Sequence, residues 1–146
     1  MADDVEDLVR TTAEAASAII AGDIRRYVEL IRHADDYTLM PPYGGDTWRG
    51  FDDSPEALDA MARFFRGGEA TLQVDATYAS GDLAVLVVVE RQHGEVGGLP
   101  DQDCSLRVTL VFRREGDRWM LVHRHADPLT RRMSHEALAR LLRDEG

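Results

Sequence analysis

The sequence has 146 residues and a mass of 16.3 kDa, which suits one domain with a sizeable core and is too short for two ordinary ones. Apolar residues make up 44%, charged residues 30%, and the mean hydropathy is -0.33, so a chain too polar to fold is excluded. The net charge of -10 opposes binding to nucleic acid or to an anionic lipid surface. We therefore expect one domain over residues 1–146, with no nucleic-acid partner and no membrane partner.

The chain begins with a pattern that predicts two helices. Over residues 3–21, apolar side chains recur at spacings of three and four, as on one face of an amphipathic helix. Gly22 interrupts the pattern, and Asp23 stands where it can cap a second helix. We expect this second helix to end near His33.

A loop and a third helix follow. Residues 38–55 hold three of the five prolines, a density that no helix interior tolerates, so we predict a loop there with a short strand at 37–40. Ser54 followed by Pro55 is a typical helix start. Gly67 and Gly68 predict the end of this helix.

Beyond the third helix the apolar period changes to two. Segments rich in valine, leucine, threonine and aromatic residues are separated by short polar turns, which predicts four antiparallel strands joined as hairpins. Their expected ranges are 71–79, 83–93, 105–114 and 119–125. After Pro128 a short helix capped by Ser134 is expected, with Leu138, Leu141 and Leu142 facing inward.

This order of elements predicts an α+β fold in which three helices cover one face of a curved antiparallel sheet. Residues 83–89, LAVLVVV, are apolar at every position, so we expect both faces of that strand to be buried. A second copy of the sheet is the natural cover for the other face. We therefore expect a homodimer, with Leu86 or its neighbours of opposite parity in the interface.

The segment WMLVHRHADP near the C-terminus concentrates the side chains that carry chemistry. Strand alternation predicts that Trp119, Leu121, His123 and His125 share one face. The two imidazoles either form hydrogen bonds at a sheet end or line a pocket as acid, base or ligand donor. Only Asp127 is nearby as a third metal ligand, so we expect neither a metal nor another cofactor.

Charged residues within the predicted strands are further candidates. Asp75 and Glu90 are candidate acid or base groups, since burial raises the pKa of a carboxyl group, although solvation or pairing with arginine is the alternative. Arg91, Arg107 and Arg113 are strand arginines that can pair with these acids or bind an anionic ligand. Trp119 is a candidate wall of the same pocket.

Two aromatic residues of the proline-rich loop, Tyr43 and Trp48, are candidate walls or lid of a pocket. All 17 basic residues are arginine, which excludes chemistry through a lysine amine. The single cysteine, Cys104, is expected to be a buried structural thiol. No apolar stretch near Met1 is typical of a signal peptide, so we expect a cytoplasmic protein.

The order of these motifs resembles the SnoaL-like branch of the NTF2-like superfamily, often described as ketosteroid isomerase-like. The resemblance rests on paired helices meeting at AGD, the loop PPYGG that ends in RG, the third helix, and a last strand with the pattern WxxVHxH. The last pattern also resembles the association domain of calcium/calmodulin-dependent kinase. The resemblance implies an NTF2-like (cystatin-like) fold, a cone-shaped α+β barrel with an apolar pocket at its wide end, and a homodimer.

What the resemblance implies about chemistry is mixed. The isomerases of the family use an aspartate base before a proline and a tyrosine in the first helix, and here these positions fall on Pro41 and near Ala15. The related epoxide hydrolases use an asparagine, which this chain lacks. The polyketide cyclases use an aspartate and a histidine, and both residue types remain.

Two hypotheses of function follow. In the first, a pocket binds a small apolar or aromatic molecule, and His125, assisted by His123, supports proton transfer of the isomerase, cyclase or dehydratase type. In the second, the chain is a non-catalytic ligand-binding or dimerisation module. A cupin-like metalloenzyme is disfavoured because the predicted helices precede the strands. Whether the protein is an enzyme stays open at this point.

Overall fold

A computed structural model describes residues 2–144 of the chain. Four helices and seven strands follow one another along these residues. Their bounds are α1 Ala2–Ile20, α2 Ile24–Leu30, β1 Arg32–Met40, β2 Trp48–Arg49, α3 Pro55–Phe64, β3 Phe65–Ser80, β4 Leu83–Val96, β5 Gln102–Asp103, β6 Leu106–Glu115, β7 Arg118–Pro128 and α4 His135–Arg143.

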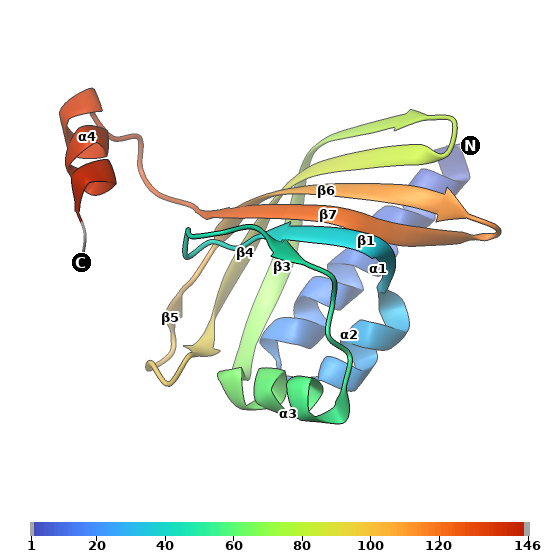
Figure 1. The fold of residues 1–146 in the computed structure, drawn as a ribbon, viewed down its shortest axis with the longest axis horizontal. Helices are drawn as coiled ribbons and strands as arrows, with labels where there is room; N and C mark the ends of the chain where they lie inside the picture. Colours follow the sequence, from blue (N-terminus) through green and yellow to red (C-terminus); the bar gives the residue numbers. More distant parts are fainter. Residues whose placement is uncertain (1, 145–146) are drawn as a thin grey trace.

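The strands form one strongly curved sheet in the order β2-β1-β7-β6-β4-β3, with β5 paired to β4. The sheet curls around α1 and α2, which lie on its concave side, and α3 lies beside α2 at one end (Figure 1). The expected α+β cone is confirmed. The sheet is mixed rather than fully antiparallel, because β1, which follows α2, runs in the same direction as β7 and pairs with β7 in parallel.

The predicted helix starts are confirmed by their caps. The carboxylate of Asp23 accepts a hydrogen bond from the backbone N–H of Arg26, and the hydroxyl of Ser54 accepts one from the N–H of Ala57, both at 3.2 Å. The second helix is shorter than expected, because Ile31 is already extended and begins the transition to β1. Both caps depend on residues within three positions, which is why the sequence alone predicts them.

The core lies between α1 and the concave face of the sheet. On β4, Ala84, Leu86 and Val88 alternate toward it and are buried, as the period of two predicts. Gly68 on β3 lets α1 approach closely, because a Cβ atom at this position would lie 2.9 Å from Cγ1 of Ile20. The glycine therefore sets the distance between helix and sheet.

The prediction for the C-terminal helix is half right. The hydroxyl of Ser134 caps α4 by accepting a hydrogen bond from the N–H of Ala137 at 3.0 Å. The leucines, however, do not face inward: Leu138, Leu141 and Leu142 are all exposed. The segment after β7 carries α4 away from the sheet, so the helix projects beside the rest of the molecule (Figure 1). None of the helices in residues 2–144 is long and apolar enough to cross a membrane.

Candidate functional site

A β-bulge in β7 decides which side chains enter the cone. Leu121 pairs with Phe112 of β6, whereas His123 pairs with the preceding residue, Val111, so Val122 is an extra residue in the strand. A bulge shifts the alternation of side chains by one position. Leu121 and Arg124 therefore both face inward, and the expectation that Leu121, His123 and His125 share a face is wrong.

Arg124 forms a bidentate ion pair with Glu90 inside the cone. Nη1 and Nη2 of Arg124 each donate a hydrogen bond of 2.8 Å to one carboxylate oxygen of Glu90. The Glu90 side chain is 7% exposed and that of Arg124 is 23% exposed. A charged pair at this depth has a large desolvation cost, which the two charge-assisted hydrogen bonds offset.

Three more ionisable side chains surround this pair. We call the five residues Tyr27, His33, Tyr37, Glu90 and Arg124 the inner polar cluster. The Tyr27 hydroxyl lies 3.1 Å from Nε2 of His33. The imidazole of His33 also stacks on the ring of Phe51, with centroids 3.7 Å apart and planes inclined by 2°. Aromatic rings therefore hold the polar groups of the cluster in place.

The hydroxyl of Tyr37 is accessible to solvent. Tyr37 is 4% exposed, and its hydroxyl forms no hydrogen bond with any residue in the described range 2–144. Yet no fully buried side-chain nitrogen or oxygen in that range is without a partner. The hydroxyl must then be the accessible part of Tyr37. Solvent also reaches Arg124, whose side chain is 23% exposed, so two hydrogen-bond donors of the cluster are accessible to solvent.

Burial and the charge of Arg124 adjust the acidity of the cluster. Burial raises the pKa of Tyr37 to about 12 and raises that of Tyr27 as well. Burial, assisted by the nearby Arg124 charge, lowers the pKa of His33 to about 4. Burial alone would lower the pKa of Arg124, but the Glu90 carboxylate outweighs it and raises it. At pH 7 both tyrosines and His33 are therefore neutral, and Arg124 is charged.

The histidine pair lies on the outer face, the convex side of the sheet that is turned away from α1. Nδ1 of His123 and the hydroxyl of Thr38 are 2.7 Å apart, which ties β7 to β1. His125 is 46% exposed, and its Nε2 lies 3.4 Å from a carboxylate oxygen of Asp127. The two imidazole centroids are 6.4 Å apart. A role of His123 and His125 in proton transfer stays a prediction, and any such role belongs to the outer face.

The strand residues predicted beside them are dispersed. Asp75 is exposed and accepts a hydrogen bond of 2.8 Å from the amide of Gln73, so of the two alternatives its carboxylate follows the solvated one. Arg91 is exposed and donates to the same Gln73. Arg107 is exposed on the outer face, opposite Asp127. Of the two predicted strand carboxylates, only Glu90 enters the cone.

The predicted aromatic residues lie at the periphery. Trp119 is half-buried, and the guanidinium of Arg114 lies 4.4 Å from its ring centroid. Tyr43 and Trp48 are both exposed. Partial burial raises the pKa of Tyr43, and the charge of Arg124 opposes this rise, so the Tyr43 hydroxyl lies within electrostatic range of the cluster. The ring of Tyr43 meets that of Phe64 of α3 edge to face, with centroids 6.4 Å apart.

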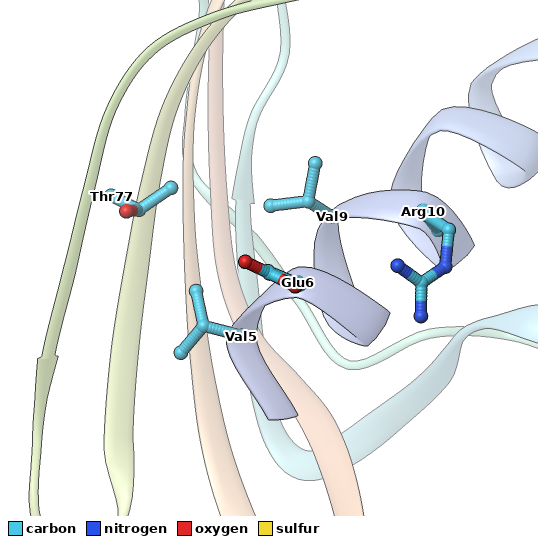
Figure 2. Close-up of a pocket in the computed structure, with 5 residues that line it drawn as sticks. All are labelled: Val5, Glu6, Val9, Arg10 and Thr77. Atoms are coloured by element: carbon cyan, nitrogen blue, oxygen red, sulfur yellow. The ribbon is translucent and has the colours of Figure 1, made fainter. Parts of the chain in front are cut away.

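Two clefts open on the surface of the molecule. The first, of about 310 Å³, lies between the start of α1 and β3 and is mostly apolar. Figure 2 shows Val5 and Val9 on the side of α1 that faces Thr77 of β3. In the second, Nδ1 of His93 is 2.9 Å from a carboxylate oxygen of Asp101, and this hydrogen bond raises the pKa of His93.

Cys104 is half-buried, and burial raises the pKa of its thiol, so a reactive thiolate is disfavoured. Among residues 2–144, no group of three or more histidine, cysteine or acidic side chains is arranged to hold a metal ion.

Sequence reasoning missed four of the five members of the inner polar cluster. Arg124 was assigned to the wrong face because a bulge has no sequence signature here. Tyr27 lies on the apolar stripe of α2, where it is typical of core packing. Glu90 had a usable signal, since it continues the inward series of Ala84, Leu86 and Val88 by one more step of two.

Comparison with known proteins gives a consistent result. The family model described as "SnoaL-like domain" matches residues 8–129. No functionally curated protein sequence matches the chain significantly.

Solved structures with the same fold include three with low sequence identity. A candidate dehydratase of the NTF2-like family from Streptomyces avermitilis is 21% identical, with a TM-score of 0.68 over 88% of this chain and 96% of that one. An NTF2-like superfamily protein of Salmonella enterica is 17% identical, with a TM-score of 0.67 over 92% and 94%. The association domain of C. elegans CaMKII is 19% identical, with a TM-score of 0.63 over 86% and 95%.

Proposed function

The chain belongs to the SnoaL-like domain family, and from this premise we propose that it binds a small molecule inside the cone. The molecule has a planar or apolar body and a hydrogen-bond acceptor, a carboxylate or a carbonyl, that contacts Arg124 and Tyr37. The observation that carries the proposal is that two hydrogen-bond donors of the inner polar cluster, the Arg124 guanidinium and the Tyr37 hydroxyl, are both accessible to solvent.

The cluster has donors to spare for such a ligand. A guanidinium carries five N–H groups, and Glu90 accepts from only two of them. Within residues 2–144 no other hydrogen bond to the Arg124 guanidinium forms, so its remaining N–H groups can donate to a ligand. The Tyr37 hydroxyl adds one more donor, and Phe51 and Tyr27 supply aromatic surface for the ligand body.

Binding is favoured over proton transfer at this cluster. An effective general base or acid has a pKa near the working pH. His33, with a pKa of about 4, is a weak base at pH 7, and Tyr37, with a pKa of about 12, is a weak acid. The environment thus keeps both groups neutral. This supports the non-catalytic hypothesis of a ligand-binding module, whereas catalysis would need a proton acceptor supplied from elsewhere.

The test uses benzoate and acetophenone as probes, titrated into the protein and observed by NMR of the ligand. We expect benzoate to bind, and the double variant Arg124→Gln/Glu90→Gln to weaken it by about 10-fold to 100-fold, the effect of losing a charge-assisted hydrogen bond. Both partners are changed together so that no charge is left buried and unpaired.

The matched control is Arg107→Gln, which removes an exposed arginine of the outer face and should leave benzoate binding unchanged. If acetophenone alone binds, the ligand acceptor is a neutral carbonyl. Equal affinity of both probes for the double variant and for the native protein would contradict the proposal.

A second function, self-association through the outer face, is supported by a separate observation. Val85, Val87 and Val111 form an apolar row there that is only half-buried, although valine is usually buried. Association domains among the similar structures also favour this function. We propose a homodimer in which the outer faces of two sheets pack together. Self-association and ligand binding are compatible, because the inner cluster lies on the other side of the sheet.

A further inference from the structure

The leucines of α4 form an apolar face without a partner in the described chain. Leu138, Leu141 and Leu142 follow the helical spacing of three and four, so they lie on one side of the helix. Leu141 is 61% exposed and Leu142 is 77% exposed. Three neighbouring leucine side chains exposed to water are unfavourable relative to the same side chains buried against an apolar surface. The helix is therefore suited to pack against an apolar surface.

The charge of this segment differs from that of the rest of the protein. Residues 129–146 carry four arginines and three acidic residues, whereas residues 1–128 carry 13 arginines and 24 acidic residues. The C-terminal segment thus has a small net positive charge, whereas the remainder is strongly acidic. Opposite net charges favour association between the segment and the acidic part of this protein. An anionic membrane is disfavoured as a partner, because residues 1–128 would be repelled by it.

The cleft between α1 and β3 matches the α4 helix in apolar character and in charge. It is lined by Val5, Val9 and Thr77, and its volume of about 310 Å³ is enough for leucine side chains. Glu6 and Arg10 also line the cleft; Arg10 pairs with Asp7 of the same helix, whereas the carboxylate of Glu6 forms no ion pair with any residue from 2 to 144. The first ten residues contain four acidic side chains and one arginine. An apolar cleft at the acidic start of α1 is complementary to a basic helix with a leucine face.

The cleft of the same chain is out of reach of α4. Thr77 of β3 and Arg124 of β7 lie in one row of paired residues that runs across the sheet. They are three strand spacings, or about 14 Å, apart. Pro128, where the connection to α4 starts, is about 13 Å further along β7. Because α1 fills the concave side, the route crosses the outer face and turns around the edge of β3. The six residues 129–134, which span about 20 Å when extended, are too few for this path.

We propose that α4 docks into the α1–β3 cleft of a second copy of this chain. Leu141 and Leu142 enter the cleft between Val5 and Thr77, and the net positive charge of the C-terminal segment is attracted to the acidic start of the partner's α1. The contact is separate from packing between outer faces, since cleft and outer face lie on opposite sides of the sheet. Docking of α4 is a further contact in self-association, whether or not the outer faces of the two sheets also pack together.

Site-specific cross-linking between chains tests this docking. In a Cys104→Ser background, one preparation carries Val5→Cys and a tag, and an untagged preparation carries Leu141→Cys. The two are mixed, and oxidised glutathione accepts the two electrons and two protons released as the disulfide forms. We expect a tagged–untagged disulfide species on non-reducing gels. The matched control, Arg140→Cys on the opposite side of α4, should give at least about tenfold less of it.

Further arms of the test make each result decisive. A chain carrying both Val5→Cys and Leu141→Cys should link to other chains and not close on itself, and closure within one chain would overturn the proposal. So would equal yields from Leu141→Cys and Arg140→Cys, or no cross-link at all while circular dichroism shows native helix content. The yield should fall as sodium chloride rises from 0.05 to 1 M, because salt screens the charge attraction.

Discussion

At the scale of single residues, the inner polar cluster depends on mutual neutralisation. Arg124 and Glu90 share two hydrogen bonds of 2.8 Å, and a single substitution at either position would leave the other charge inside the cone. Breaking such a pair by removing one partner costs about 3–5 kcal/mol in fully buried sites. The residual exposure of Arg124 reduces this cost, because water reaches one side of its guanidinium.

His33 should make the protein sensitive to acid. Its pKa is about 4 in the folded chain and about 6.5 in an unfolded one, so between these values the unfolded state binds more protons. Stability from His33 is therefore complete above pH 6.5 and is lost as the pH falls toward 4. We expect the native protein to lose about 1–2 kcal/mol of unfolding free energy between pH 7 and pH 5 from this residue.

Urea unfolding of His33→Gln at pH 7 and pH 5 measures this contribution. The variant should lose less stability on acidification than the native protein. His135→Gln, at an exposed histidine of α4, is the control and should follow the native pH dependence. Identical pH dependence of all three proteins would show that His33 is not protected from protonation.

At the scale of elements, the distance between α1 and the sheet decides the shape of the cone. Gly68 and Gly94 face each other on β3 and β4 beneath Ile20, the last residue of α1. A Cβ on Gly68 would lie 2.2 Å from the carbonyl oxygen of His93, which is a backbone atom that cannot simply rotate away. The absence of side chains here allows the helix to lie directly on the strands.

Gly68→Ala should therefore be strongly destabilising. We expect a loss of about 2–3 kcal/mol of unfolding free energy, as is typical when a core has no room for added atoms. Gly98→Ala is the matched control: its φ of +83° strains an alanine, but no atom lies within 4 Å of the new Cβ, so about 1 kcal/mol is expected. Chemical denaturation of both variants gives the comparison. Equal losses of unfolding free energy in Gly68→Ala and Gly98→Ala would mean that α1 is not tightly packed against β3 at Gly68.

At the scale of the whole molecule, β4 separates two environments. Leu86 is 0% exposed and faces α1, whereas Val87, the next residue, is half-buried on the outer face. Of the sequence-based alternatives for the interface, the neighbours of Leu86 rather than Leu86 itself are therefore the candidates. Both faces of this strand are apolar, and among the described residues the inner face is covered, whereas Val85 and Val87 of the outer face are only half-buried.

Arginine substitutions at these two positions should have opposite effects. We expect Val87→Arg to give a folded, soluble monomer, because a charge on the outer face opposes packing between two sheets. Leu86→Arg should prevent folding, because its charge would be buried without a partner, at a cost of several kcal/mol. Light scattering coupled to size exclusion gives the masses, and circular dichroism reports the fold. A native protein that runs as a 16.3 kDa monomer at micromolar concentration would refute the homodimer.

Much of the fold was predictable from the sequence, and the reason is local. The caps at Asp23, Ser54 and Ser134 each bind a backbone group three residues away, so their evidence lies within a few positions of the chain. The inward series on β4 follows from a period of two, and the family resemblance was carried by the order of such segments. The family model confirms this identification.

The site required the tertiary structure. A bulge forms where one strand offers two residues against one of its neighbour, so the inward position of Arg124 depends on how β7 pairs with β6 and not on β7 alone. The cluster joins Tyr27 of a helix, Glu90 of a central strand and Arg124 of the last strand, separated by up to 97 positions. The sequence determined which segments become helices and strands, because that choice depends on near neighbours. Only the folded chain decided which side chains meet, because that choice depends on strand register over long range.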